Sequence, residues 1–195
     1  MKNVQSGIGS IFGATGIKKL EENLRFSDTF RNKVALADAY FAAGYTDKAI
    51  ALYESSLTGS FTENEHVRFQ LILAYFEKQR YSEVITFAKK LYKFPQFTRS
   101  RAHMFYALAL EQAGETEQAE KEFKVMKGRF SYFEPRYNYG LFLVRAGRLN
   151  DAKQVFTEMI NEAGHLTSYE RRNSRPWVSL AKDELKKMET KAVSA

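Results

Sequence analysis

The sequence predicts an all-α protein built from repeated helix-turn-helix units, and three observations support this prediction. The phrases AGYTDKA, AGETEQA and AGRLNDA begin at Ala43, Ala113 and Ala146. Apolar residues recur at helical spacing before and after each phrase. The chain has 195 residues, 44% of them hydrophobic, which is enough for a packed core. A helical repeat array accounts for all three observations.

The repeat has a period close to 35 residues. Gly44, Gln79, Gly114 and Gly147 occupy one slot and lie 35, 35 and 33 residues apart. Before each slot, three residues share one stripe of a helix: Leu36-Ala37-Tyr40, Leu71-Ile72-Tyr75, Tyr106-Ala107-Leu110 and Tyr139-Gly140-Leu143. After each slot, two more residues lie one turn apart: Ala49 and Tyr53, Val84 and Ala88, Ala119 and Phe123, Ala152 and Phe156. Each unit is therefore a helix, a tight turn and a second helix.

The residue types in each unit follow from packing. Short residues such as Ala37, Ala49 and Gly140 let paired helices approach to about 8–10 Å. A glycine in the turn can adopt positive φ and close the first helix. The residues that follow it, Thr46-Asp47, Thr116-Glu117 and Asn150-Asp151, are expected to cap the second helix and to match its dipole. We interpret the repeated phrase as a structural turn, not a catalytic loop.

These residues resemble the tetratricopeptide repeat (TPR) family, whose pattern is W-x2-L-G-x2-Y…A-x3-F at a period of 34. The resemblance covers four repeats at about 32–64, 66–98, 101–131 and 134–163 and implies a right-handed α-α superhelix with terminal capping helices. The second repeat departs from the pattern at Ile72, Gln79, Val84 and Ala88. The tryptophan slot holds Lys33, Arg68, His103 and Arg136 instead.

The two ends are interpreted as caps on a single domain of residues 17–190. Ile17, Leu20 and Leu24 predict an N-terminal capping helix over 17–30, preceded by a flexible segment of residues 1–16. Ser174 and Pro176 are consistent with the start of a C-terminal capping helix over 174–190, followed by a tail of residues 191–195. A polar last helix would solvate the end of the array.

Patterns typical of enzymes are absent from the sequence. There is no cysteine, and His66, His103 and His165 are far apart without an HExxH motif. The glycines before residue 17 match neither GxGxxG nor a phosphate loop, and no G-x-S-x-G elbow occurs. We therefore expect no catalytic residue, no cofactor and no metal site. No run approaches the ~20 apolar residues of a membrane span, so we expect a soluble, cytoplasmic protein.

The resemblance implies that the other side of each first helix lines a concave groove. The expected groove residues are Arg31, Val34, Asp38, Phe41, His66, Phe69, Leu73, Phe76, Arg101, Met104, Leu108, Tyr137, Leu141 and Val144. As a continuous exposed stripe, their apolar members would exceed the patch that soluble monomers usually show. Three occupants could cover it: a partner's helix or extended peptide, the N-terminal segment with Ile8, Ile11 and Phe12, or a second copy of the chain.

The leading hypothesis for function is a non-enzymatic protein-protein interaction scaffold that binds a hydrophobic peptide or helix in this groove. Family members that hold the acidic C-termini of chaperones use a clamp of Lys, Asn and Arg. Here Val34, Asp38 and Phe69 stand on that face, and Asp38 would repel a carboxylate. Arg31, His66 and Arg101 could instead fix an acidic end of a hydrophobic ligand.

Two alternatives concern the charge of the chain, whose formal net value is +7. Basic residues are in excess over 78–103 and near the C-terminus, which suits anionic lipid or nucleic acid.

The repeat order and the final Arg-Pro-Trp segment also resemble the cytosolic part of bacterial TPR proteins anchored in the inner membrane, which implies a membrane-proximal module. Nucleic acid is the least favoured partner, because the inner helices lack a regular polar code.

Overall fold

The computed structural model describes residues 14–127 and 133–193, and every regular element within these ranges is a helix. The chain divides into two compact units, unit 1 up to Glu115 and unit 2 from Thr116. The boundary falls inside the third expected repeat, so each unit is described by itself. The expected flexible segment lies outside the described residues except for positions 14–16, which are helical.

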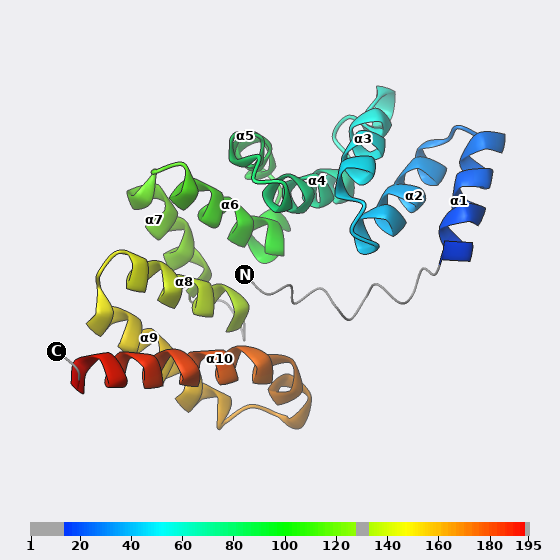
Figure 1. The fold of residues 1–195 in the computed structure, drawn as a ribbon. Helices are drawn as coiled ribbons and strands as arrows, with labels where there is room; N and C mark the ends of the chain where they lie inside the picture. Colours follow the sequence, from blue (N-terminus) through cyan, green and yellow to red (C-terminus); the bar gives the residue numbers. More distant parts are fainter. Residues whose placement is uncertain (1–13, 128–132, 194–195) are drawn as a thin grey trace. The chain divides into compact units, whose positions relative to one another are not determined.

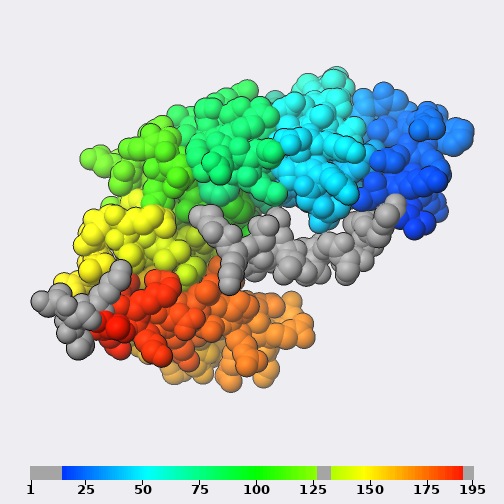
Figure 2. All heavy atoms as spheres, viewed as in Figure 1, coloured from blue at the N-terminus to red at the C-terminus, as the bar shows by residue number. Residues whose placement is uncertain are grey.

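Unit 1 is a succession of helices that each pack against their neighbours in the sequence (Figure 1). Its α-helices are α1 (Ala14–Phe26), α2 (Phe30–Ala42), α3 (Thr46–Ser56), α4 (Glu65–Glu77), α5 (Tyr81–Leu91) and α6 (Arg101–Gln112). Two short 3-10 helices, η1 (Gly59–Phe61) and η2 (Phe97–Arg99), connect the pairs. Helix α4 also packs against α6, as expected when repeats stack. Figure 2 shows α1 to α5 in that order as one continuous packed body.

Unit 2 contains α7 (Thr116–Lys127), α8 (Phe133–Arg145), α9 (Leu149–Ala163) and α10 (Ser168–Val193). Helices α8 and α9 form the fourth expected pair, and α10 packs against both of them. The ring of Trp177 on α10 lies 5.9 Å from that of Tyr137 on α8, and Ala181 is fully buried. The middle of α10, from Trp177 to Ala181, therefore packs onto the last helix pair as a capping helix.

Small residues set the distance between paired helices, as the sequence predicts. Ala37 and Ala49 in unit 1 and Ala152 in unit 2 are completely buried. Gly140 gives the clearest case, because a Cβ atom there would lie 2.3 Å from the Cε1 atom of Phe156. The aromatic ring of α9 thus fills the space where α8 lacks a side chain.

The turn after each first helix has the same backbone geometry in all four slots. Gly44, Gly114 and Gly147 have φ values between 75° and 82°, and Gln79 has a φ of 59°. In the first turn, Gly44 N–H donates to the carbonyl of Phe41 and Tyr45 N–H donates to that of Tyr40. The same two bonds recur at Gln79, Gly114 and Gly147. This is the Schellman arrangement, so the predicted left-handed cap is confirmed.

The expected caps of the second helices α3 and α9 are not confirmed. Helices α3 and α9 have Tyr45 and Arg148 at the N-cap position, without a side-chain capping bond. Thr46 lies inside α3, and its buried hydroxyl donates to Glu77 at 2.8 Å. The turn is too tight for a separate cap, because the residue that completes the Schellman bonds also starts the next helix. Asp47 and Asp151 lie in the first turns, where they match the helix dipole as expected.

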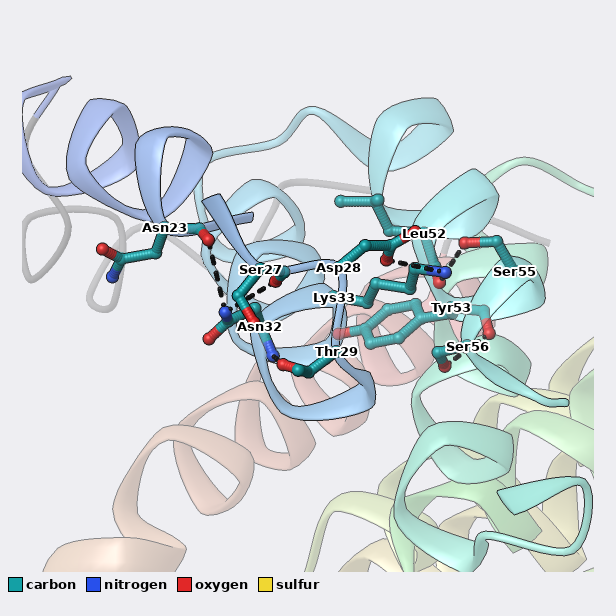
Figure 3. A network of polar contacts seen from close by, with 10 residues as sticks. All are labelled: Asn23, Ser27, Asp28, Thr29, Asn32, Lys33, Leu52, Tyr53, Ser55 and Ser56. Carbon is teal, nitrogen blue, oxygen red and sulfur yellow. Dashed lines mark hydrogen bonds and ion pairs between the residues drawn. The ribbon is translucent and has the colours of Figure 1, made fainter. Parts of the chain in front are cut away.

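The connection from α1 to α2 is held by a polar network (Figure 3). The side chain of Thr29 accepts a bond from Asn32 N–H and caps α2. The Asn32 amide donates to the carbonyls of Asn23 and Ser27 at 3.3 and 2.9 Å. Helix α1 therefore ends at Phe26, four residues before the expected limit of the capping helix, and it begins at Ala14 instead of residue 17.

The last helix begins six residues before its expected start at Ser174. The hydroxyl of Thr167 accepts a bond from Glu170 N–H, and the Glu170 carboxylate accepts bonds from Thr167 N–H and its hydroxyl. This reciprocal pair is a capping box, which fixes the true start. Pro176 consequently lies inside α10 instead of in its first turn.

One tyrosine in most repeats bonds to a glutamate of the preceding helix. Tyr40 donates to Glu21 of α1 at 2.5 Å, and Tyr75 donates to Glu54 of α3 at 2.6 Å. In unit 2, Tyr139 donates to Glu120 of α7 at 3.2 Å. We call these bonds the Tyr-Glu clasps. Each clasp joins a first helix to the helix before it, so it links neighbouring repeats.

Candidate functional site: the inner face of α2 and α4

The expected groove residues of unit 1 lie on three successive first helices, and their exposure differs. On α2 and α4, Val34, Phe41, Phe69 and Leu73 are half-buried. On α6, Met104 and Leu108 are only 2% and 5% exposed. The expectation of a continuous exposed apolar stripe is therefore wrong at α6, which packs against both α4 and α5. Among the expected groove residues of unit 1, the half-buried apolar side chains lie on α2 and α4. We call the surface formed by Val34, Phe41, Phe69 and Leu73 the inner face.

Phe76 also departs from the expected pattern. Its ring lies 4.8 Å from that of Phe105 on α6 and 5.5 Å from that of Tyr81 on α5. The guanidinium of Arg101 lies 5.4 Å from the Phe105 ring. Phe76 is therefore part of an aromatic contact between repeats, which accounts for its half-buried state. Phe69 is nearer the connection, with its ring 6.2 Å from that of the fully buried Phe97.

The expected groove residues of unit 2 are on α8. Leu141 and Val144 are half-buried, whereas Tyr137 is 9% exposed. The Tyr137 ring packs between Phe156 of α9 and Trp177 of α10. The expectation that Tyr137 is exposed is thus wrong, because α10 covers it. Burial is also the main cause that raises its pKa.

A polar chain of three side chains crosses the inner face. The hydroxyl of Tyr53 donates to Asp38 Oδ1 at 2.5 Å, and Asp38 Oδ2 lies 3.4 Å from His66 Nε2. Tyr53 is completely buried, whereas the side chains of Asp38 and His66 are 37% and 55% exposed. The chain therefore leads from the core of the first repeat to its surface and joins α3, α2 and α4.

The pKa values of this chain follow from its contacts. Burial, with help from Asp38, raises the pKa of Tyr53, so its hydroxyl stays protonated and donates. The bond to Asp38 raises the pKa of His66, although partial burial opposes this effect. The His66 imidazole therefore gains its proton at a higher pH than an isolated histidine.

This chain was not predicted from the sequence, although Asp38 and His66 were each expected in the groove. The available signal is Tyr53, which stands where Phe123 and Phe156 stand in later repeats. A buried phenolic hydroxyl requires a hydrogen-bond partner, and Asp38 is the acid that its own repeat supplies. The contact with His66 depends on how α2 and α4 are staggered, which a single repeat does not encode.

The basic stretch over 78–103 is partly neutralised within unit 1. Lys78 pairs with Asp47 at 2.8 Å and Lys93 pairs with Glu63 at 3.0 Å. Arg80 pairs with Glu83 at 2.7 Å. The excess of positive charge on this segment is thus smaller at the surface than its sequence indicates.

Within residues 14–127 and 133–193, no group of three or more His, Cys, Asp or Glu side chains is arranged to hold a metal ion. In the same ranges, no helix combines the length and the apolar character that crossing a bilayer requires.

Comparison with solved structures identifies the fold. YrrB, described as a TPR protein with an unusual peptide-binding site, superimposes with a TM-score of 0.63. It is 12% identical, and the match covers 75% of this chain and 76% of that one. The fold is that of the tetratricopeptide-repeat proteins. The family resemblance predicted from the repeat residues is thereby confirmed at the level of the fold.

Other matches agree with this TPR fold. A crystal structure of MamA has a TM-score of 0.68 and 14% identity, covering 85% of this chain and 97% of that one. The AMB-1 form of MamA has a TM-score of 0.65 and 20% identity, with coverage of 80% and 92%. A family model described as tetratricopeptide repeat matches residues 100–121, which include α6 and the start of α7. No curated protein sequence matches the chain.

Proposed function

We propose that this TPR protein is a protein-protein interaction scaffold and that the inner face of α2 and α4 binds an apolar peptide or helix. The observation that carries the proposal is the half-exposed apolar set Val34, Phe41, Phe69 and Leu73 on adjacent helices. When a partner buries such a surface, the free energy of the complex falls by about 25 cal/mol for each Å² of apolar area removed from water. The peptide-binding site of YrrB, which has the same fold, supports a ligand of this class.

The test uses charge placed on the inner face. Leu73→Glu and Phe69→Glu are each compared with Ala51→Glu, which puts the same charge on an exposed position of α3. Binding of apolar peptides from a peptide array is measured by titration calorimetry, and circular dichroism checks the fold. We expect the two inner-face variants to lose binding and Ala51→Glu to retain it. Equal binding by all three folded variants would refute the proposal.

A second candidate function rests on the surface of α10. Arg172, Arg175, Lys182 and Lys186 are all exposed and lie within an arc of about 80° on that helix. We propose that this stripe contacts anionic lipid, with a contribution of about 1 kcal/mol for each cation near the membrane surface. Sedimentation with phosphatidylserine vesicles should decrease in the variant with all four residues changed to Gln. Equal sedimentation with neutral vesicles would exclude this function.

A further inference from the structure

The inner face contains one ionisable pair among its apolar side chains. Asp38 of α2 and His66 of α4 lie 3.4 Å apart, and both remain partly open to solvent. Val34 and Phe41 stand one turn before and after Asp38, while Phe69 stands one turn after His66. A ligand that covers these apolar residues also removes the pair from water.

The charge of the pair depends on the protonation of one imidazole. With His66 protonated, the pair is an ion pair of zero net charge. With His66 neutral, Asp38 leaves a net charge of −1, which hydrogen bonds stabilise without a countercharge. Removing an uncompensated charge from water costs more than removing a paired one. An apolar ligand therefore gains affinity when His66 carries its proton.

Several other titratable groups on or near α4 have partners away from this pair. Glu54 accepts from Tyr75, Glu63 pairs with Arg68 and Lys93, Glu77 accepts from Thr46, and Glu83 pairs with Arg80. Glu65 precedes His66 on α4, and Arg31 lies on α2 two turns before Asp38. The bond to Asp38 is the largest cause that raises the pKa of His66, and partial burial opposes it.

Helices α2 and α6 each carry an exposed cation in the first turn. Arg31 of α2 and Arg101 of α6 are exposed, and α4 packs against both of these helices. Carboxylates on a ligand would match these guanidinium groups, whereas lysines would meet like charge. The Asp38 carboxylate repels an acidic ligand unless a protonated His66 neutralises its charge. An acidic ligand therefore matches the charge of this surface only when His66 is protonated.

We infer that the Asp38-His66 pair makes the inner face a pH-dependent site for an apolar segment flanked by acidic residues. This inference rests on the proposed function and adds the chemistry of the partner and its regulation. The segment binds the state in which His66 is protonated and paired with Asp38. Affinity therefore rises as the pH falls through the pKa of His66.

The test uses two synthetic octapeptides with blocked ends and the same apolar centre, Leu-Phe-Leu-Leu. One has two glutamates at each end and the other has two lysines. Their dissociation constants are measured with the full chain at about pH 5.5 and about pH 8, on either side of the ordinary histidine pKa. We expect the glutamate peptide to bind about tenfold more tightly at the lower pH. Preference for the lysine peptide at both values would overturn the inference.

Two conservative variants separate the cause of the pH dependence. Asp38→Asn keeps an acceptor for Tyr53 and removes the charge, so binding at about pH 8 should tighten and the gain in affinity at the lower pH should disappear. His66→Gln cannot take up a proton, so binding should stay at the weaker level throughout. An NMR titration of the His66 imidazole should give a higher pKa with the glutamate peptide than without it. An unchanged pH dependence in His66→Gln would overturn the inference.

The outcomes also separate this inference from the proposed function. Binding that Leu73→Glu abolishes, but that has the same affinity at both pH values, overturns the pH-dependent site and leaves the apolar site intact. Absence of binding by either peptide at either pH overturns both. Thermal unfolding of each variant, followed by circular dichroism, verifies that the compared proteins are folded.

Discussion

Gly140 lies where the ring of Phe156 leaves no room for a side chain. In Gly140→Ala the new Cβ atom would be 2.3 Å from Phe156 Cε1, so the ring or α9 must move. Alanine gains about 1 kcal/mol in helix propensity, but overpacking in a core costs typically 1–3 kcal/mol. We expect a net loss in the free energy of unfolding, measured by urea denaturation.

A matched double variant checks the cause of this loss. Phe156→Leu removes the ring, so adding Gly140→Ala to it should cost little or even stabilise α8 through helix propensity. Hydrogen exchange should place the effect of the single variant in α8 and α9. A Gly140→Ala protein as stable as the wild type would contradict the close approach of these two helices.

Gln79 is the one described residue other than glycine with positive φ. A left-handed conformation costs an L-residue about 1–2 kcal/mol, which glycine avoids. Gln79→Gly should therefore raise the free energy of unfolding by about 1 kcal/mol after the added entropy of the unfolded chain. Gly44→Ala, at the equivalent turn, should lower it by a similar amount. Equal stability of both variants and the wild type would contradict a strained turn.

At single residues, positions within the repeat could be predicted from the sequence, but contacts between repeats could not. The spacing of the slots placed Gln79 in the turn, whereas its positive φ was not predicted, because the sequence offers that conformation only at glycine. The same spacing predicted that Gly140 occupies a position where paired helices approach closely. The contact of Asp38 with His66 could not be predicted, because it depends on the stagger of two helices from different repeats.

Among the helices, the Tyr-Glu clasps provide a regular link between one repeat and the next. In Tyr75→Phe the carboxylate of Glu54 loses a bond at 2.6 Å from a donor in the buried core. Hydrogen bonds to charged groups contribute about 1.5–3 kcal/mol, and the exposed Glu54 recovers part of this through water. We expect a destabilisation of about 1 kcal/mol in thermal unfolding.

The third repeat supplies the matched control for the clasp. Glu21 and Glu120 each lie nineteen residues before the tyrosine to which they bond. In the third repeat the residue nineteen positions before Tyr106 is Phe87, which cannot accept a hydrogen bond. Tyr106→Phe removes the same atom at the corresponding position and should have a smaller effect than Tyr75→Phe. If Tyr106→Phe is the more destabilising change, the clasp does not contribute as described.

Pro176 lies inside α10 because a capping box earlier in the sequence starts the helix. The sequence of Ser174 and Pro176 is a plausible helix start, but Thr167 and Glu170 form the capping box. Pro176 lacks an N–H group, so the carbonyl of Arg172 loses its intrahelical donor. Pro176→Ala should restore this bond and stabilise α10 by up to about 3 kcal/mol, seen as slower hydrogen exchange over 168–180. Unchanged exchange there would contradict the helical placement of the proline.

For the whole molecule, acidic pH should destabilise both units through carboxylates held by cations. In unit 1, bonds from Arg68 and Lys93 lower the pKa of Glu63 to about 2. In unit 2, burial raises the pKa of Glu120, but bonds from Lys124 and Arg148 outweigh it and bring the value to about 2. A depressed pKa stabilises the fold above the unfolded value of 4.5, and this contribution is lost as the pH falls through about 2.

The expected result is a decreasing Tm as the pH is lowered from about 4.5 to about 2. Glu63→Gln and Glu120→Gln should each weaken this dependence. Because Glu63 is exposed, high salt should reduce its share more than that of the partly buried Glu120. A constant Tm over this range would refute the assignment of these ion pairs.

The number and order of the repeats could be predicted because they depend on local period and residue size. The exposure of the candidate site could not be predicted from the sequence. Met104 and Tyr137 stand in the expected groove slots, yet their burial results from tertiary packing that the pattern within one repeat does not specify. The family pattern therefore assigned the correct slots and overestimated the apolar surface open to a ligand.

The clasps also define a unit that can be copied. Tyr40 and Tyr75 are equivalent residues one period apart, so residues 41–75 begin and end at the same point of a first helix. This cassette contains Glu54 and Tyr75, which are the acceptor and the donor of one complete clasp. Inserted in tandem after Tyr75, it would lengthen the array by one repeat and bring its own link to the new neighbour.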